Sequence, residues 1–502
     1  MLYLDHAASA PLSQAALDAM HPWLTGGLGN PASVHAAGRQ MADALEAARA
    51  LVAEVLSTDG SAETQGRAGE HDAGDFGGGT TGTATSTFRV RAEEIMFTSG
   101  GSEANAAAVM GMARAARDRD PRRTRLLVSA VEHSSVLAPA AQLAEREGFE
   151  LVTLPVDREG AVDLAVLARE LGLPGAGGSL PPGPGPGGTG NDHGGEGDET
   201  TALPSPGPAL PPTGSSSPAR TCALVAVQAV NNEVGTIQPL AEVAALAHAA
   251  GARLLTDAVA AVGATDLEEL ARLADALTLS AHKFGGPQGA GVLRLAPGTP
   301  FVPLMPGAQE SGRRAGTPGV ANALGTAAAL QDALGQAVRT QAAELQESRG
   351  GTAHAEPDER RSPRAQSEHG PLCEQHRLRE RLEATVLAAA GGRARATGPS
   401  DPARRSPHIA SFAFPGLGGE TLLMELEERG VLCSSGSACH AGSTEPSHVL
   451  LAMGLSPDAA RSAVRMSFGP DLTDADLPAV AEAVSGAVRA VAGLGAEVGA
   501  GR

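Results

Sequence analysis

Short apolar runs alternate with amphipathic segments through the middle of the chain, from about residue 94 to residue 296. The apolar runs have the length of buried strands, and the segments between them repeat apolar residues at helical spacing. Such alternation predicts strand-helix-strand crossovers and a mostly parallel sheet with helices on both faces. We predict strands at 94–98, 125–129, 150–155, 223–227, 253–257 and 276–279, and helices at 99–117, 138–146, 162–171, 240–250 and 267–273.

The C-terminal part of the chain has a second, less regular pattern. Strands are predicted at 408–415 and 463–467, and helices at 420–429 and 473–492. This order is typical of a smaller α+β domain rather than of a repeated crossover. We therefore expect two domains, at 1–340 and 373–502.

Three segments carry neither pattern. They are rich in Gly, Pro, Ser, Thr or charged residues, and they contain few apolar side chains. Such segments cannot bury enough apolar surface to offset the entropy of ordering, so we expect surface insertions. They lie at about 57–90, 172–220 and 346–372.

Composition narrows the possible classes of function. The 502 residues carry a formal net charge of −19, which argues against direct binding to nucleic acid or to a membrane surface. Four cysteines are too few for a disulfide scaffold and fit a reducing compartment. The N-terminus lacks the pattern of an export signal, and no apolar run reaches membrane-spanning length. We therefore expect a cytoplasmic protein.

The predicted strand at 276–279 ends in Ser280-Ala281-His282-Lys283, which a glycine turn follows. A lysine amine condenses with an aldehyde when burial and nearby positive charge keep part of it deprotonated. Ser280 and His282 add two hydrogen-bonding groups beside that amine. The combination suits pyridoxal phosphate, which carries both an aldehyde and a phosphate. The alternative is a solvated lysine with no chemical role.

A second predicted strand, at 253–257, ends in Asp257. One helical crossover separates Asp257 from Lys283, so the two strand ends would lie side by side at the carboxyl edge of the sheet, where ligands bind. A carboxylate beside the pyridine nitrogen would keep that nitrogen protonated and strengthen the ring as an electron sink.

Gly101 and Ser102 follow the strand at 94–98 and open a helix. Glycines before a serine N-cap would leave backbone N–H groups for an anion, although many helices begin this way. Beside a lysine that holds pyridoxal phosphate, this helix start is a candidate phosphate cradle.

His133 and Asn232 also follow predicted strands. An imidazole at His133 could stack on a cofactor ring or move protons, and the alternative is a histidine that only bonds within its loop. Asn232 could meet the cofactor or the substrate.

A loop of small residues, 434–443, carries Cys439. Metal binding by Cys433, Cys439 and His440 is one interpretation, but the spacing is poor for zinc and a fourth ligand is missing. A mobile nucleophilic thiolate at Cys439 fits better, and the alternative is an ordinary loop cysteine. Cys433 and Cys222 adjoin apolar residues, so we expect packed thiols there.

Arg465 interrupts an apolar strand and therefore needs an anionic partner, either a substrate carboxylate or an internal acid. Asn30 is a candidate substrate contact, unless it only makes the turn before Pro31. Arg313-Arg314 precede Gly316-Thr317 and could bind phosphate, with a solvated charged turn as the alternative.

Taken together and in this order, the motifs resemble those of the cysteine desulfurase family among the class V aminotransferases. The similarity covers nearly the whole chain apart from the three insertions. The matching runs are Tyr3-Leu4-Asp5-His6-Ala7-Ala8, Gly29-Asn30-Pro31, Phe97-Thr98-Ser99-Gly100, Glu103-Ala104-Asn105, Glu132-His133, Asn231-Asn232-Glu233-Val234-Gly235, Ser280-Ala281-His282-Lys283, Gly316-Thr317, Ser434-Ser435-Gly436-Ser437-Ala438-Cys439, Glu445-Pro446-Ser447 and Arg465-Met466-Ser467.

This resemblance implies the type I pyridoxal phosphate-dependent transferase fold, an α/β fold. Its mostly parallel seven-stranded sheet has helices on both faces, and a smaller α+β domain follows. Lys283 would hold the cofactor covalently and move the substrate's α-proton, Asp257 would pair with the pyridine nitrogen, and His133 would stack on the ring. The residues implied to hold the cofactor are Gly101, Ser102, His133, Asn232, Asp257, Ser280, His282, Lys283 and Thr317, the last reaching the phosphate of the other subunit in a homodimer.

For the substrate, the resemblance implies that Asn30, Asn232 and Arg465 bind the carboxylate of L-cysteine. Cys439 would attack the substrate sulfur and become a persulfide, and alanine would leave. The sulfur would pass to a protein acceptor, such as an iron–sulfur scaffold, or to tRNA thiolation. A selenocysteine lyase or another class V aminotransferase is the alternative.

One departure bears on activity. Ala260 stands where the family usually has a glutamine that hydrogen-bonds the phenolic oxygen of the cofactor. Its loss removes about 1 kcal/mol of net hydrogen bonding. A weakly active enzyme or a non-catalytic sulfur-transfer scaffold is therefore a further alternative.

Overall fold

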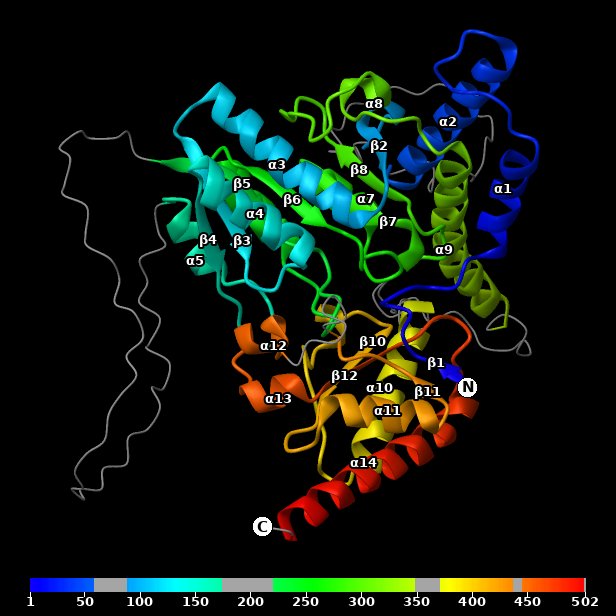
Figure 1. The fold of residues 1–502 in the computed structure, drawn as a ribbon, viewed down its shortest axis with the longest axis vertical. Coiled ribbons are helices and arrows are strands. Elements are labelled where there is room, and N and C mark those ends of the chain that lie inside the picture. The colour runs from blue at the N-terminus through cyan, green and yellow to red at the C-terminus, as the bar shows by residue number, and fades with distance from the viewer. Residues whose placement is uncertain (58–87, 174–219, 348–370, 437–444, 501–502) are drawn as a thin grey trace, which may run out of the picture.

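The computed structural model describes residues 1–57, 88–173, 220–347, 371–436 and 445–500. The centre of the fold is a seven-stranded sheet (Figure 1) in the order β2-β8-β7-β6-β5-β3-β4. Its strands are β2 (Ile95–Thr98), β3 (Arg123–Ser129), β4 (Glu150–Leu154), β5 (Thr221–Ala226), β6 (Arg253–Asp257), β7 (Ala276–Ser280) and β8 (Gly291–Leu295). Because only β8 runs against its neighbours β2 and β7, the prediction of a mostly parallel seven-stranded sheet is confirmed.

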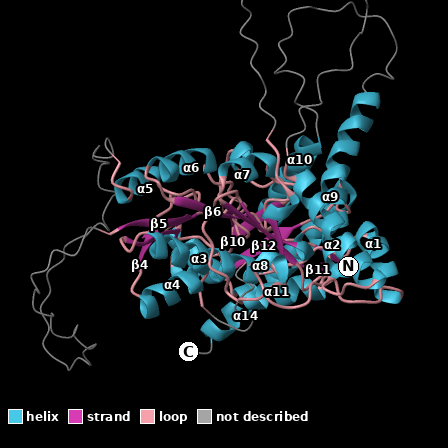
Figure 2. Cartoon of the chain, turned by 90° about the horizontal axis from the view of Figure 1, so that it is seen from above, coloured by secondary structure: helices cyan, strands magenta, loops and turns pink. Residues whose placement is uncertain are grey.

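Helices cover both faces of this sheet (Figure 2). Leu254 on β6 packs with the helices of one face, and its neighbour Leu255 packs with those of the other. A strand buried on both faces reads as a continuous apolar run, which is why β6 was predictable from sequence. The helices are α6 (Leu240–Ala249) and α7 (Leu267–Leu273) on the first face, α3 (Gly101–Arg119) and α4 (Ser134–Glu147) on the second, with α1 (Gln14–Thr25), α2 (Ala36–Val55), α5 (Leu164–Glu170) and α9 (Val320–Glu347) also packed around the sheet.

A three-stranded antiparallel sheet forms the second unit, with β10 (Ile409–Ala413) between β12 (Ala463–Ser467) and β9 (Arg395–Ala396). Its core includes Phe412 and Val464, and Leu4 from the N-terminus joins it. The helices of this part are α10 (Pro371–Ala389), α11 (Gly419–Glu428), α12 (His448–Ala452), α13 (Pro457–Arg461) and α14 (Leu477–Ala500).

The N-terminal strand pairs with a strand of the C-terminal unit. β1 (Leu2–Tyr3) pairs in parallel with β11 (Val431–Leu432), beside the small sheet (Figure 1). The residues that follow β1 then return to the large sheet, where Ala10 N donates to His282 O at 2.8 Å.

The predicted domain boundaries stay a prediction, and the three predicted insertions fall mostly outside the described residues. Within the described residues, no helix is long and apolar enough to cross a membrane.

Strand β8 was not predicted, because a buried arginine interrupts it. Arg294 is 2% exposed, and its Nε donates to Glu94 Oε2 at 3.0 Å. Its Nη1 also donates to the carbonyl oxygens of Ala271 and Ala274 at 2.8 and 2.9 Å. A fully bonded guanidinium is tolerated in the core, and its tertiary partners are not visible in the local sequence.

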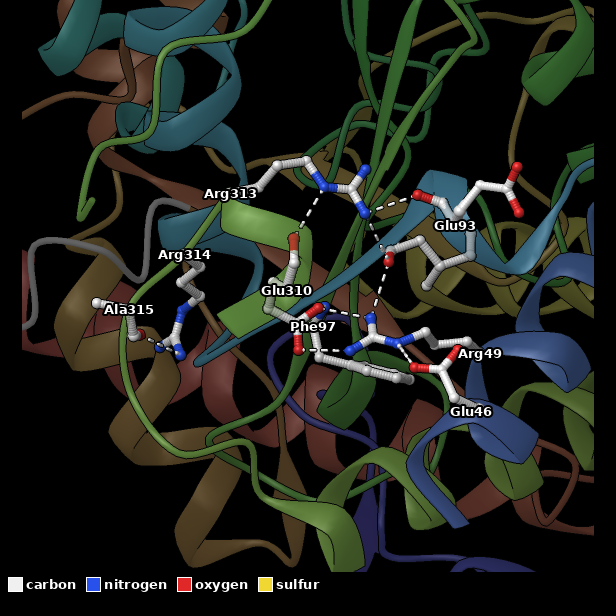
Figure 3. A network of polar contacts seen from close by, with 9 residues as sticks. Glu46, Arg49, Glu93, Phe97, Glu310, Arg313, Arg314 and Ala315 are labelled. Carbon is white, nitrogen blue, oxygen red and sulfur yellow. Dashed lines mark hydrogen bonds and ion pairs between the residues drawn. The ribbon is translucent and has the colours of Figure 1, made fainter. Parts of the chain in front are cut away.

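A second buried ion pair fixes the turn α8 (Gln309–Gly312) against the sheet (Figure 3). Arg49 on α2 donates from Nη2 to Glu310 Oε1 at 2.7 Å, and Glu310 Oε2 accepts from Phe97 N at 3.0 Å. Glu310 has φ +52°, a conformation that costs energy for a residue with a side chain. The ion pair therefore holds a strained turn next to β2, which leads directly into α3.

Removing the charge of Glu310 should destabilise the fold. In Glu310→Gln the buried guanidinium of Arg49 keeps its charge without a carboxylate, and breaking such a buried pair costs about 3 kcal/mol. We expect a clear fall in the midpoint of urea unfolding, followed by circular dichroism. The control is Glu93→Gln, which breaks the exposed Arg91–Glu93 pair and should not shift the midpoint measurably. Equal midpoints for the two variants would contradict the role given to Glu310.

Candidate active site

The two strand ends singled out by the sequence lie next to each other. β6 and β7 pair in parallel with Asp257 opposite Thr278, and Ala258 N donates to Thr278 O at 3.0 Å. Lys283 follows β7 in a single 3₁₀ turn, Ala281–Lys283. The carboxylate and the amine therefore belong to the same carboxyl edge of the sheet, the usual ligand-binding edge of such folds.

Asp257 is held by two N–H donors. Its Oδ1 accepts from Val259 N at 2.9 Å, and its Oδ2 accepts from Asn105 Nδ2 at 2.7 Å. Asn105 lies on α3 and is itself 1% exposed, and its Oδ1 accepts from Thr278 Oγ1 at 2.6 Å. The carboxylate is thus locked in one orientation by a side chain whose own acceptor is occupied.

The same asparagine connects Asp257 to His133. Asn105 Nδ2 donates to Ser135 Oγ at 2.9 Å, and Ser135 Oγ lies 2.7 Å from His133 Nδ1. His133 is the N-cap of α4, and its Nδ1 also accepts from Ser135 N at 3.1 Å. Because Nδ1 accepts a backbone N–H, a neutral imidazole must carry its proton on Nε2.

The start of α3 is shaped as an anion cradle. A Cβ atom added at Gly101 would lie 2.9 Å from Val259 Cγ2 and 3.0 Å from Ser280 Cβ, so only glycine fits there. The first N–H groups of a helix have no intrahelical acceptor and favour an anion. Ser280 is 4% exposed and stands beside this helix start.

One detail of the predicted cradle was wrong. The N-cap of α3 is Gly100, without a side-chain bond, and Ser102 lies inside the first turn with its side chain exposed. Ser102 therefore caps nothing, although it remains within the turn that faces Ser280.

His282, which precedes Lys283, is half-buried. Its burial lowers the pKa of the imidazole, and the nearby charge of Lys283 lowers it further.

A pocket of about 630 Å³ opens beside Lys283. Lys283 Nζ donates to the carbonyl oxygens of Ala7 and Ala8 at 2.6 and 2.9 Å. Asn232 and Ala260 line the same pocket, so the predicted substrate contact and the unusual alanine both adjoin the lysine. Further lining residues are His6, Phe284, His408, Ile409, Phe468 and Asp471.

Arg465 is engaged by internal partners. It is 2% exposed, and its Nη2 donates to Asp5 Oδ1 at 2.7 Å and to Ser434 Oγ at 2.9 Å. Its Nη1 donates to Asn232 O at 2.8 Å. The internal ion pair that the sequence left open is therefore present, and binding of a substrate carboxylate stays a prediction.

Three other predicted groups lie away from the pocket. Asn30 is exposed, and its Oδ1 accepts from Ala32 N at 2.9 Å, as expected for an asparagine that makes its own turn. Thr317 is exposed. Arg313 donates to the carbonyl oxygens of Glu310 and Glu93 (Figure 3), and Arg314 pairs with Glu103, so internal partners already occupy the two arginines considered for phosphate.

Two of the cysteines, Cys222 and Cys433, are at least partly buried in the structure. Burial raises the pKa of both Cys222 and Cys433 to about 12, and Cys433 packs against the core of the small unit. Both are packed thiols, as predicted. Cys439 lies in 437–444, outside the described residues, and its role as a nucleophile stays a prediction.

Sequence reasoning missed two buried groups at this edge. In the sequence, Asn105 stands out only as part of the run Glu103-Ala104-Asn105, although an asparagine in an alanine-rich helix signals a polar partner when it is buried. Glu132 likewise stands out only as the neighbour of His133. Burial raises the pKa of Glu132 well above its usual range, and the charge of Asp257 adds to the effect. Its Oε1 accepts from Gln228 N at 2.8 Å.

Comparison with known proteins identifies the family. The aminotransferase class-V family model matches residues 2–64, 84–172, 216–349 and 373–480. An IscS-like cysteine desulfurase of Mycobacterium tuberculosis (strain ATCC 25618 / H37Rv) is 33% identical, over 97% of this chain and 96% of that protein. A cysteine desulfurase of Cereibacter sphaeroides is also 33% identical, over 99% of this chain and 98% of that protein.

Solved structures agree on the fold. A NifS-like protein aligns with a TM-score of 0.66 at 24% identity, covering 96% of this chain and 98% of its own. The apo structure of a cysteine desulfurase from Thermococcus onnurineus NA1 aligns with a TM-score of 0.65 at 20% identity, covering 97% of this chain and 95% of its own. The fold is therefore that of the type I pyridoxal phosphate-dependent transferases, and the chain belongs to the cysteine desulfurase family of class-V aminotransferases.

Proposed function

We propose that the protein is a pyridoxal phosphate-dependent cysteine desulfurase that converts L-cysteine to L-alanine and passes the sulfur on through Cys439. The observation that carries the proposal is the carboxyl edge of the sheet. There the turn that carries Lys283 follows β7, which pairs with the end of β6 at Asp257, and Asn105 links Asp257 to His133 through Ser135. Family membership and this geometry support the same chemistry.

The residues present fit the cofactor. The Gly101 cradle leaves no room for a side chain, as expected where a phosphate and backbone N–H groups must come close. Ser102, Ser280 and His282 would complete the phosphate site, and Asp257 would face the pyridine nitrogen. When bound to Lys283, pyridoxal phosphate withdraws electrons from the substrate carbons.

The protein's own groups would handle protons and sulfur. The Lys283 amine would take the α-proton of cysteine and return it, and Asn232 and Arg465 would orient the carboxylate. The Cys439 thiolate would attack the cysteine sulfur, forming an S–S bond while the C–S bond breaks. The electron pair of that bond would stay with the carbon, which is protonated to give alanine.

A homodimer is part of the proposal. The exposed Thr317 would reach the phosphate of the other subunit, and the Arg314–Glu103 pair anchors its segment to the first turn of α3. The sulfur acceptor would be a protein such as an iron–sulfur scaffold. We also propose that the protein is cytoplasmic, because the reducing conditions of that compartment would keep the thiol of Cys439 reduced.

A weaker variant of this function has one supporting observation. Ala260 lines the pocket beside Lys283 and offers no hydrogen bond to a bound ring. A desulfurase of low turnover, or a sulfur-transfer scaffold, would share the fold and the cradle. Selenocysteine as the substrate would also use the same groups, so activity must be compared on both amino acids.

The function is tested with the purified protein, pyridoxal phosphate, L-cysteine and a reductant. We expect alanine and sulfide in equal amounts. Cys439→Ala should lose sulfide release while keeping the absorbance band of the bound cofactor, and Lys283→Ala should lose that band. A wild-type protein that binds the cofactor but yields keto acid instead of alanine would refute desulfuration in favour of transamination.

Asn105 should matter for cofactor binding although it is not expected to touch the substrate. In Asn105→Ala, Asp257 loses a buried hydrogen-bond donor, which costs about 1.4 kcal/mol, or tenfold in affinity. We expect the dissociation constant of pyridoxal phosphate, measured by fluorescence titration, to rise by about that factor. The control Asn322→Ala changes an asparagine on α9, away from this network, and should leave the dissociation constant unchanged. Equal constants for wild type and Asn105→Ala would contradict the role of the network.

Restoring the family's usual glutamine should improve the enzyme. Ala260→Gln adds a donor where the phenolic oxygen is expected, and one net hydrogen bond of about 1 kcal/mol corresponds to roughly fivefold in kcat/KM. The measurement is alanine formation at several cysteine concentrations. Ala260→Leu fills a similar space without a donor and should not show the gain. A rise in both variants would point to packing instead of hydrogen bonding.

A further inference from the structure

An ion pair lies at the start of α3, where the proposed function places the cofactor phosphate. Glu103 is in the first turn of this helix, and Arg314 belongs to the segment that leads to Thr317. Arg314 Nε donates to Glu103 Oε1 at 2.5 Å, and Arg314 Nη2 donates to Glu103 Oε2 at 3.1 Å. The side chains of Glu103 and Arg314 are 13% and 19% exposed, so solvent and salt screen the pair only in part.

Glu103 also holds the backbone that leads into α3. Its Oε2 accepts from Ser99 N at 2.7 Å, so the carboxylate reaches back to the residue two positions before Gly101. Burial alone would raise the pKa of Glu103, but the bonds from Arg314 and Ser99 outweigh it, and the pKa is lowered. Glu103 is therefore an anion at neutral pH.

This anion would oppose the ligand proposed for the same helix end. A phosphate ester carries negative charge at neutral pH, and the free N–H groups at the start of α3 would attract it. A carboxylate in the same turn would repel the phosphate, because like charges that lie close together in a partly buried site interact strongly. Arg314 cancels the charge of Glu103 and so removes the conflict.

Arg314 directs its bonds to the helix start and to its own segment. The bonds to Glu103 are the main cause of the raised pKa of Arg314. Glu310 attracts Arg314 less, and Arg49 already pairs with Glu310 in the core. Arg314 Nη1 donates to Ala315 O at 3.3 Å (Figure 3), two residues before Thr317. One guanidinium therefore neutralises the first turn of α3 and braces the segment of Thr317.

We propose that the Arg314–Glu103 pair determines how tightly the site binds the phosphate of the cofactor. Glu103 is needed because it holds Ser99 N, and Arg314 is needed because the carboxylate of Glu103 would otherwise repel phosphate. Both are positioning residues, and neither is assigned as a phosphate ligand. This role rests on the proposed function, because the phosphate at α3 is that of pyridoxal phosphate.

Removing the two charges one at a time should have opposite effects. Arg314→Ala leaves the anion of Glu103 unpaired, so we expect the dissociation constant of pyridoxal phosphate to rise about fivefold or more. Glu103→Gln keeps an oxygen for Ser99 N and leaves the cation of Arg314 unpaired, so we expect the constant to fall about twofold or more. The measurement is a fluorescence titration of the cofactor-free protein. A purely structural role would weaken binding in both variants, so weaker binding in Glu103→Gln would overturn the inference.

The double variant Glu103→Gln/Arg314→Ala separates charge from anchoring. It carries neither charge, so we expect its dissociation constant to lie within about twofold of wild type. If Arg314 acts only by bracing the segment of Thr317, the double variant should bind as weakly as Arg314→Ala, and that result would refute the proposal. The matched control is Arg122→Ala, which breaks the Arg122–Asp120 pair at the other end of α3 and should leave binding unchanged.

Pyridoxal, which has the ring and the aldehyde but no phosphate, is the control ligand. We expect both single variants to bind pyridoxal within about twofold of wild type, because the charges at α3 would then meet no phosphate. Equal changes for the two ligands would rule out an effect on phosphate.

The titrations require no turnover, so they distinguish this role from the proposed function. A protein that shows the expected affinities but forms no alanine would reject desulfuration and leave the role of the pair intact. A wild-type protein that binds pyridoxal as tightly as pyridoxal phosphate would hold no phosphate at α3. That outcome would overturn the role of the pair even in an active desulfurase.

Discussion

The site depends on one buried carboxylate that must be fully hydrogen-bonded. Asp257 is 7% exposed at the end of a central strand, where an unpaired charge would be costly. Val259 N and Asn105 Nδ2 supply its two described donors, and Thr278 in turn occupies the acceptor of Asn105. Strand β6, strand β7 and helix α3 are thereby fixed to one another at the place proposed for the cofactor ring.

The N-terminal segment extends this constraint to the second unit. Asp5 pairs with Arg465 on β12, while Ala7 and Ala8 accept from Lys283 beside the large sheet. A few consecutive residues therefore set the distance between the lysine and the arginine. Since β1 also pairs with β11, a change at the N-terminus would move both partners of the site.

The sequence was most informative where one residue and its neighbours decide the structure. β6 and β7 were predicted because apolar runs buried on both faces end at Asp257 and before Lys283, and parallel strand ends must meet at one edge. Strand β8 was missed because Arg294 interrupts it, and its acceptors come from distant residues. The predicted N-cap of α3 was Ser102, but the structure has Gly100 there. A glycine can serve as an N-cap without a side-chain hydrogen bond, so the preference for serine at this position misled the prediction.

The partners of Arg465 show why a site cannot be derived from a pattern alone. A strand-embedded arginine predicts an anion, but the pattern does not say whether that anion is a substrate or Asp5. The structure contains the internal pair, and yet Arg465 Nε is buried without a hydrogen-bond partner among the described residues. A buried charged donor left unpaired costs free energy, and a substrate carboxylate is a group that could relieve that cost. Because that nitrogen is buried, the described residues contain only the internal pair, and binding of a substrate carboxylate by Arg465 stays a prediction.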